Sequence, residues 1–362
     1  MRLFQNVGLY TSYFNRLNRV AAGCTTFETR RAVLLADRFG APHLLEPVLN
    51  GEAQAFFTPG NDAILQRMWA IENGLPRDVS LEDILLAQIE AHRTEVFYNL
   101  DPIRYGANFL GRLPQCVKYR IAWQASPSPT SSLGLYDLLV CNFPTILSRY
   151  KLAGWNAAYF SPSHDPAMDK WANNSERTID VAFVGGYSRH HRRRAKVLEA
   201  IASLRHKRVL AFHIDSSRLT HLSESPFGQL LPLGKHRRHR DIRAVARDPV
   251  YGLDLYDILS SAKIVLNGAI DMAGNDRGNM RCFEALGCGA LLLSDEGDYP
   301  LGIHDRLNVR MYRDASSAVS IVEEMLENEP MRANVALRGF HFIRSQYSKA
   351  RQWHDFQHLV HP

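Results

Sequence analysis

The sequence predicts an α/β protein built from two Rossmann-like, doubly wound parallel sheets that face a cleft. Short apolar runs alternate with helical stretches along the chain, which is the pattern of a parallel sheet wrapped by helices. The alternation stops in residues 163–177, which are rich in Pro, Asn, Asp and Ser, and restarts at residue 179. The 362 residues also exceed the usual size of a single core. We therefore expect a first domain at residues 1–165 and a second at 166–340.

The first half contains enough apolar runs for a complete sheet. Residues 1–9 predict a strand that ends at Gly8, and Thr25-Thr26 offers a capped start for a helix that runs to about Phe39. Residues 42–49 form either a short strand or an active-site loop. The other expected elements are strands at 95–101, 119–124, 137–141 and 157–161 and helices at 81–92 and 144–150.

The second half is organised around residues 279–295. This stretch predicts a helix start, a helix end at the small residues Gly287 and Gly289, and then a buried strand. Upstream, a strand at 179–184 is expected to lead into a tight turn, Gly185-Gly186-Tyr187-Ser188. The remaining expected elements are strands at 209–214, 263–267 and 309–312, helices at 189–203, 317–327 and 331–357, and a helical turn at 256–261.

Composition argues against several classes of protein. Apolar residues make up 46% of the chain and charged residues 22%, which is ordinary for a globular enzyme. No apolar run approaches the ~20 residues that span a bilayer, and the first eight residues do not resemble a signal peptide. Five cysteines without a Cys-x-x-Cys pair predict reduced thiols. We expect a cytoplasmic protein whose net charge of +6 suits an anionic ligand or peripheral association with an anionic membrane face.

The fold class itself predicts where a ligand binds. In open parallel sheets, ligands bind beyond the carboxyl ends of the strands, and pockets favour domain interfaces. Function is therefore expected in the loops that follow the predicted strands. These loops come after Val7, Leu100, Gln124, Val184, Asn267 and Leu293.

Arg281 and Glu284 are the first candidates for a binding site. They lie three residues apart and so share one face of the helix predicted in residues 279–287. A guanidinium and helix N–H groups can bind a diphosphate, and a carboxylate can bind the hydroxyls of a ribose. The alternative is an ordinary ion pair on a surface helix.

The glycine pair and the basic runs are candidates for anion binding. Gly185 and Gly186 allow an anion to approach the backbone, with Ser188 and Arg189 at the start of the following helix. The alternatives are a plain turn and a solvated charged face. The two runs, residues 189–194 and 235–240, carry no recognisable nucleic-acid module, so nucleic acid is not an expected partner.

Carboxylates in the predicted loops are candidates for binding and for proton transfer. Asp276 lies in the loop before the Glu284 helix and can bond sugar hydroxyls, or it is a turn or N-cap residue next to Gly278. Asp101 ends a predicted strand and can accept a proton from an attacking hydroxyl, or it forms an Asx turn. The chain has no Asp-x-Asp, which argues against a metal-diphosphate site.

Three further residues are candidates for contacting an acceptor. Tyr10, His43 and Trp123 lie in loops at comparable positions. An aromatic ring of Tyr10 or Trp123 can stack on a sugar, and the alternative for both is packing in the core.

The second half resembles a known family. Residues 180–186, 255–267 and 279–295 are similar in order and spacing to the C-terminal domain of CgeB-like (spore maturation protein type) glycosyltransferases of GT-B fold. The resemblance covers about residues 178–358, and Asn-Met-Arg-x-Phe-Glu-Ala-Leu-x-x-Gly is its strongest part. Residues 136–140 and 154–165 look like the end of a GT-B acceptor domain.

The resemblance implies a role for each site residue. Glu284 matches the ribose-binding Glu, and Asp276, one methylene shorter, matches the first acidic position of the Glu-x7-Glu pattern. Arg281 matches a contact to the donor phosphates, and Asn267 and Asn279 are grouped with the donor-binding residues. The resemblance also implies that residues 341–362 form a helix that crosses back to the first domain.

We therefore predict a metal-independent glycosyltransferase without a cofactor. It would move a sugar from a nucleotide-diphosphate sugar to the hydroxyl of a glycan, lipid-linked or protein acceptor, in bacterial glycan or surface polysaccharide synthesis or in glycosylation. Asp101 is the candidate base if the reaction inverts the anomeric centre, and only a positioning residue if the reaction retains it. Two alternatives stay open: a nucleotide-sugar epimerase or hydrolase of the same fold, and a non-catalytic binding protein.

Overall fold

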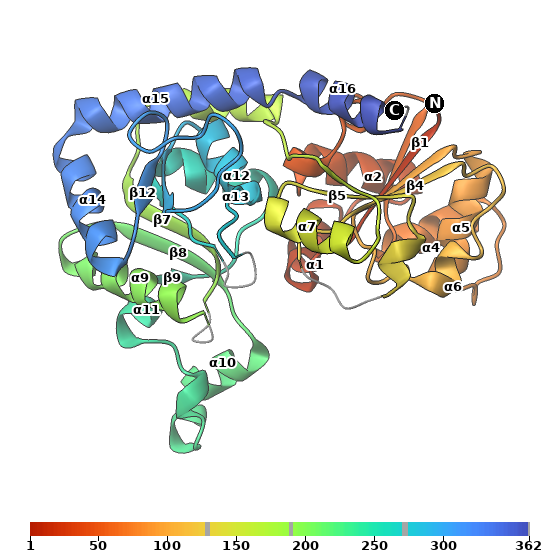
Figure 1. Cartoon of the computed structure of the whole chain (residues 1–362). Helices are drawn as coiled ribbons and strands as arrows, with labels where there is room; N and C mark the ends of the chain where they lie inside the picture. Colours follow the sequence, from red (N-terminus) through yellow and green to blue (C-terminus); the bar gives the residue numbers. More distant parts are fainter. Residues whose placement is uncertain (127–130, 188–190, 270–273, 361–362) are drawn as a thin grey trace. The chain divides into compact units, whose positions relative to one another are not determined.

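The chain folds into two compact units. The computed structural model describes residues 1–126, 131–187, 191–269 and 274–360 (Figure 1). Unit 1 consists of Met1–Ser163 and Tyr347–Pro362, and unit 2 of His164–Gln346. Each unit contains one six-stranded sheet in which all neighbouring strands are parallel. The predicted α/β class with two parallel sheets is confirmed.

The order in which strands are added to the sheet of unit 1 reverses at its first strand. Its spatial order is β2 (Ala55–Pro59), β1 (Leu3–Val7), β3 (Val96–Asn99), β4 (Tyr119–Trp123), β5 (Leu138–Cys141) and β6 (Ala157–Tyr159). Because β2 and β3 pair with opposite edges of β1, the topological switch point lies between β1 and β3. All five residues of β1 are buried, as expected for a strand covered on both faces.

Helices connect the strands of unit 1, as parallel pairing requires. The longer ones are α1 (Phe14–Val20), α2 (Phe27–Ala36), α4 (Ala63–Glu72), α5 (Leu81–Ala91) and α7 (Pro144–Leu152). A further helix of unit 1, α16 (Lys349–Val360), follows unit 2 in the chain and connects no strands. A capping box between Thr26 and Thr29 begins α2 as the sequence predicts. Helix α16 is fixed by Lys349, whose buried ammonium donates to the carbonyls of Ala41 and Leu44 at 2.6 Å each.

Unit 2 repeats this architecture with a longer set of connections. Its spatial order is β12 (Arg310–Tyr312), β11 (Leu291–Asp295), β10 (Ala262–Leu266), β7 (Ile179–Gly186), β8 (Leu210–Asp215) and β9 (Ala246–Arg247). Strands β8 and β10 pair with opposite edges of β7, so the switch point lies between β7 and β10. The main helices are α9 (Arg192–Ala202), α11 (Arg240–Val245), α12 (Gly252–Ser261), α13 (Met280–Gly287), α14 (Ala315–Glu327) and α15 (Glu329–Gln346).

Apolar side chains hold the layers of unit 2 together. Helices α9, α11 and α14 bury their apolar stripes against alternate residues of the strands, such as Phe183, Phe212 and Leu293. Helices α12 and α13 lie against β10 and β11. Among the described residues, no helix has the length and apolarity needed to cross a membrane.

Two local expectations need correction. Of the two alternatives for residues 42–49, a short strand or an active-site loop, the strand is wrong, because the segment contains the 3-10 turn η2 (Ala41–His43) and the short helix α3 (Glu46–Leu49). Pro42 and Pro47 begin these turns at positions where a missing N–H costs nothing. The helix predicted at 331–357 is two helices, α15 and α16, which are interrupted at Tyr347 and Ser348.

Candidate active site

Two glycines shape the switch point of unit 2. Gly185 is the seventh residue of β7, and Gly268 follows the end of β10. A Cβ atom at Gly185 would lie 2.7 Å from an Nη atom of Arg194, and one at Gly268 would lie 2.8 Å from the hydroxyl of Tyr312. Glycine at both positions leaves room for the Arg194 guanidinium and the Tyr312 hydroxyl beside the strand ends.

Arg194 is brought to the switch point by the first turn of α9. Its guanidinium lies 5.1 Å from the ring centre of Phe183, a cation–π contact. Among the described residues no carboxylate forms an ion pair with it, and its buried Nε has no hydrogen-bond partner. Burial lowers the pKa of Arg194; the nearby Tyr312 and Asp295 oppose this shift, and the charge of Arg281 adds to it. A largely desolvated arginine that forms no ion pair is a candidate binding site for an anion.

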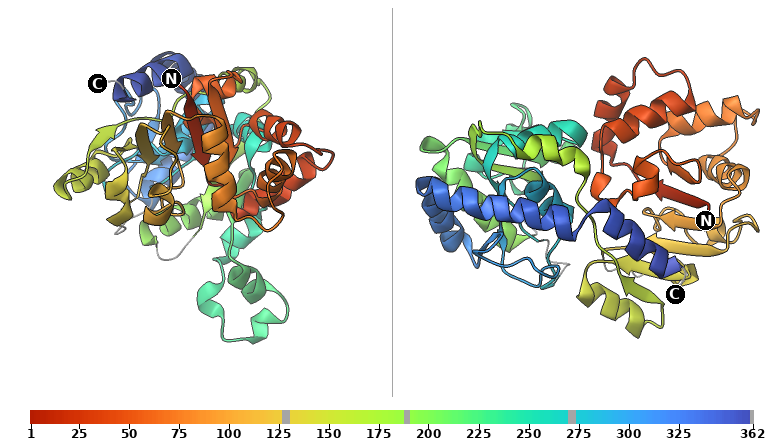
Figure 2. Two further views of the ribbon diagram at one scale, coloured as in Figure 1. Left: turned by 90° about the vertical axis from the view of Figure 1, so that its right-hand side faces the viewer. Right: turned by 90° about the horizontal axis from the view of Figure 1, so that it is seen from above.

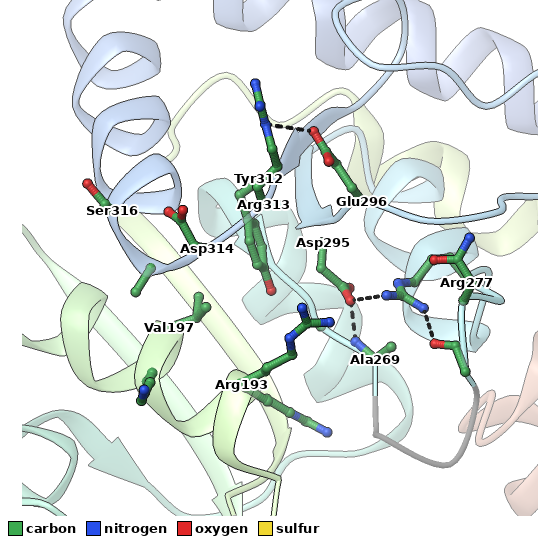
Figure 3. Close-up of a pocket in the computed structure, with 16 residues that line it drawn as sticks. Arg193, Val197, Ala269, Arg277, Asp295, Glu296, Tyr312, Arg313, Asp314 and Ser316 are labelled. Carbon is green, nitrogen blue, oxygen red and sulfur yellow. Dashed lines mark hydrogen bonds and ion pairs between the residues drawn. The ribbon is translucent and has the colours of Figure 1, made fainter.

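A pocket of about 1030 Å³ opens beside Arg194 (Figure 3). Five basic and three acidic side chains line it, from the start of α9, the loop before α13, the ends of β11 and β12, and the residue before α14. Two of the acids are already paired: Asp295 binds Arg277 at 2.7 Å and Glu296 lies 3.3 Å from Arg313. The pocket is large enough for a nucleotide sugar, and its lining carries an excess of positive charge.

Arg281 and Glu284 form the predicted i,i+3 pair, but they form it inside the unit. The Nη1 atom of Arg281 lies 2.6 Å from Oε2 of Glu284, and Glu284 is only 1% exposed. Burial raises the pKa of Glu284, whereas Arg281 opposes the rise. Neither side chain lines the pocket beside Arg194. The pair is therefore an internal ion pair in this structure.

The polar side chains between β10 and α13 bond to one another. The amide of Asn267 donates to Asn279 Oδ1 at 3.0 Å and to Ser294 Oγ at 3.2 Å, and Asn279 donates back to Asn267 at 3.2 Å. Asn279 is the N-cap residue of α13. Asp276, which is 1% exposed, forms an isolated bridge with Asp298 and is not the N-cap. These contacts fix the loop in front of Glu284.

The prediction of a tight turn that begins at Gly185 is wrong. Gly185 and Gly186 are the last two residues of β7 and pair with Ile214 and Asp215 of β8. Neither has a positive φ, so neither is required to form a turn. Ser188 and Arg189, the other two residues proposed for anion binding here, lie outside the described residues.

Asp101 lies at the switch point of unit 1. A Cβ atom at Gly8 would lie 2.6 Å from Asp101 Oδ2, so the carboxylate rests against the end of β1. Arg104 Nε donates to the same oxygen at 2.9 Å, and the Asp101 side chain is 21% exposed. The backbone N–H of Asp101 donates to Asn99 Oδ1 at 2.9 Å, and this oxygen also accepts a bond from Asn6 at 2.8 Å. A buried polar network thus positions the carboxylate.

Two of the three predicted acceptor-binding side chains touch. The rings of His43 and Trp123 lie 4.4 Å apart in an edge-to-face contact near the carboxyl end of β4. Tyr10 is 60% exposed and packs its ring edge-on against Phe39. Burial, together with the charge of Lys349, lowers the pKa of His43 to about 3. His43 is therefore a neutral imidazole at physiological pH.

The lowered pKa of His43 makes unit 1 acid-sensitive. The unfolded chain takes up a proton on this ring below pH 6.5 and the folded chain does not, so stability falls as the pH drops from 6.5 toward 3. We expect His43→Gln to reduce the loss of unfolding free energy between pH 7 and pH 5 by ~2 kcal/mol in urea titrations. His341→Gln, at an exposed histidine, should leave that loss unchanged. An unaltered pH dependence in His43→Gln would contradict the lowered pKa.

Comparisons with known proteins agree with this architecture. Residues 193–358 match a family model described as glycosyl transferase-like. No curated protein matches the sequence. Similar solved structures are HepE from Anabaena in complex with UDP-glucose (TM-score 0.56, 10% identity, 99% of both chains) and a sucrose-phosphate synthase from Thermosynechococcus elongatus (TM-score 0.55, 9% identity, 100% of this chain and 98% of that one). A glycosyltransferase from Rickettsia africae has a TM-score of 0.54 at 8% identity over 99% of this chain and 97% of that one.

These matches show the fold of the chain and the family that its second half resembles. At such low identities the solved structures establish the fold, and the family match concerns the carboxyl-terminal part of the chain. The chain therefore has the GT-B fold of these solved structures, and the family match covers residues 193–358, somewhat less than half of the chain.

Sequence reasoning missed Arg194 as a site residue. It lies in the basic run 189–194, where Arg189 was the preferred candidate. The signal that identifies it is the phase of α9: residues 194, 197, 198 and 201 share one helix face, and Val197, Leu198 and Ile201 are buried. Within the described part of the chain, no group of three or more His, Cys, Asp or Glu side chains could hold a metal ion.

Proposed function

We propose that this protein transfers a glycosyl group from a nucleotide-diphosphate sugar to an acceptor hydroxyl. The observation that carries the proposal is Arg194, a largely desolvated cation that lies at the switch point of unit 2 without a carboxylate partner among the described residues. A diphosphate can pair directly with this guanidinium, and the adjoining pocket of about 1030 Å³ can hold the rest of a donor. UDP is the first nucleotide to test, because HepE is described in complex with UDP-glucose.

On donor binding, Arg281 would leave Glu284 and pair with the donor diphosphate instead. Arg281 lies near enough to Arg194 for the two charges to influence each other, so a diphosphate between them neutralises both. When Arg281 turns to the phosphates, Glu284 loses its cation and can accept hydrogen bonds from the ribose hydroxyls. Arg281 can therefore contact the phosphates and Glu284 the ribose, as the resemblance implies, although the two side chains are ion-paired in this structure.

The chemistry assigned to these groups is electrostatic. As the bond between the anomeric carbon and the phosphate oxygen breaks, negative charge grows on the leaving diphosphate, and fixed guanidinium groups stabilise it. The acceptor oxygen forms the new bond to the anomeric carbon and gives up its proton. In an inverting reaction Asp101 accepts that proton, and in a retaining reaction Asp101 only orients the acceptor.

Asp101→Asn tests the role of this carboxylate. If Asp101 is the base, we expect turnover to fall by about 10²–10⁴-fold with donor affinity unchanged, because the substitution removes a proton acceptor from unit 1. The control is Asp83→Asn, which breaks another exposed Asp–Arg pair of unit 1, between Asp83 and Arg112. A wild-type rate in Asp101→Asn would exclude Asp101 as the base.

A thermal-shift panel followed by a transfer assay tests the whole proposal. A nucleoside diphosphate at about 100 times its Kd stabilises a protein by ~2.7 kcal/mol, so UDP, GDP and ADP can be ranked directly. The corresponding nucleotide sugar is then incubated with candidate glycan, lipid-linked and protein acceptors. Turnover of donor without any acceptor would favour the epimerase or hydrolase, and binding without turnover would favour a non-catalytic protein. No stabilisation by any nucleotide would contradict the proposal.

A further inference from the structure

A separate segment of unit 2 projects away from the sheet. Residues 216–240, which we call the projection, run from the end of β8 to the first residue of α11 and contain α10 (Arg218–Glu224) and the 3-10 turns η6 (Gly228–Leu230) and η7 (Gly234–His236). Figure 1 and the left view of Figure 2 show α10 and its turns beyond the body of unit 2. The projection is not part of the pocket beside Arg194.

Two arginines hold the parts of the projection together through hydrogen bonds and an ion pair. Arg237 donates to the carbonyls of Ser223, Gly228 and Leu231 at distances between 2.9 and 3.1 Å. Arg238 makes a bidentate ion pair with Glu224, with contacts of 3.0 and 2.5 Å. These bonds give the projection a defined shape without a large apolar core, and they use its single acidic side chain.

The folded projection leaves large apolar side chains in solvent. Phe227 is 67% exposed and Leu230 is 84% exposed, and Leu219 and Leu222 of α10 are also exposed. Single exposed apolar residues are common on protein surfaces, but four in one short projecting segment are not explained by chance scatter. Their clustering indicates a binding surface for an apolar partner.

The same segment carries a strong positive charge. Residues 216–240 contain five Arg or Lys residues and one acid, Glu224, which is already paired. Arg218 is exposed and makes no ion pair within the described part of the chain. The Arg240 side chain is 85% exposed and lies 3.8 Å from Asp241. A segment that combines exposed apolar side chains with exposed arginines is complementary to a surface that is anionic outside and apolar beneath.

We propose that the projection docks this protein on an anionic lipid bilayer. Phe227 and Leu230 enter the boundary between headgroups and acyl chains, and Arg218 and Arg240 contact the anionic headgroups. A second copy of the chain is a poorer occupant, because it would bring two segments of the same charge together. The proposal does not depend on the donor, and it gives the membrane association expected from the net charge a defined location.

Vesicle co-sedimentation of the whole protein tests this docking. We expect binding to phosphatidylcholine vesicles that contain phosphatidylglycerol, weaker binding to pure phosphatidylcholine, and weakening by added salt. The double variant Phe227→Ser with Leu230→Ser should reduce the partition coefficient at least about tenfold, since each apolar side chain contributes to insertion. Replacing Arg218 and Arg240 by Gln should reduce it by about fivefold for each arginine lost.

A matched control variant tests whether vesicle binding depends on the projection or on exposed apolar side chains anywhere on the surface. Leu152→Ser with Leu301→Ser changes two side chains that are 87% and 89% exposed elsewhere, and it should bind vesicles like the wild type. All these positions are exposed, so thermal unfolding should confirm an intact fold in every variant. Absence of vesicle binding, equal loss in the Leu152 and Leu301 control, or unchanged binding of the Phe227 and Leu230 variant would overturn the proposal. Concentration-dependent dimerisation that the Phe227 and Leu230 variant abolishes would also overturn it and assign the projection to contacts between copies.

Discussion

Replacing Arg194 by alanine should lower kcat/KM for the nucleotide sugar by about 10²–10³-fold. The guanidinium at the switch point is expected to stabilise the charge that develops on the leaving diphosphate, and alanine removes it. Arg194→Lys keeps the charge but loses the planar fork of donors, so an intermediate loss is expected. The measurement is steady-state transfer or donor hydrolysis, together with the thermal shift produced by UDP.

The neighbouring arginine provides the control for this experiment. Arg192 is the first residue of α9 and is exposed, so Arg192→Ala removes the same charge from the same turn without opening the switch point. Wild-type activity and a normal UDP shift are expected for Arg192→Ala. If Arg194→Ala retained both while folding normally, the anion would have to bind elsewhere.

Removing Glu284 is expected to affect both stability and nucleotide binding. Glu284→Ala leaves Arg281 buried without its carboxylate, and breaking a buried pair from one side costs about 3–5 kcal/mol. Binding of the nucleotide should be strongly weakened or lost, because the ribose loses its acceptor. The measurements are urea unfolding without ligand and isothermal titration with UDP.

A second substitution separates these two effects. Glu284→Gln keeps the shape and one oxygen that can accept from Arg281, so the loss of stability should be smaller, while the weaker acceptor still reduces affinity for ribose. The control, Glu327→Ala, removes a glutamate that is 74% exposed and lies 3.8 Å from Arg208. Undiminished nucleotide affinity in a folded Glu284 variant would refute the ribose role.

The fold could be predicted because buried parallel strands have a strong signal. Strands such as β10 and β11 are nearly continuous apolar runs, and each is followed or preceded by a helix with a clear start. Strand β2 was not predicted: it has only five residues and ends at Pro59, which is atypical of a strand. The break between α15 and α16 was also missed, because the sequence of this region continues the helical pattern through Tyr347.

The candidate site was less predictable than the fold. The spacing of Arg281 and Glu284 predicted their pairing, but spacing alone does not say that Glu284 is buried. Arg192 and Arg194 of the basic run differ in burial because of the phase of α9, which turns Arg194 inward and leaves Arg192 in solvent. The contact between Asp101 and Gly8 depends on which strands become neighbours, and this information is not local in the sequence.

The anchoring of α16 has a consequence for biosynthesis. Unit 1 is composed of two segments of chain that are separated by the whole of unit 2, and Phe356 of α16 packs against Tyr98 and Phe160 of the first segment. During translation, the first segment must therefore wait, with these aromatic rings uncovered, until about 180 further residues have left the ribosome, which at ~5–20 residues per second takes on the order of ten seconds or more. Unit 2, which is continuous, can reach its native state before unit 1 does.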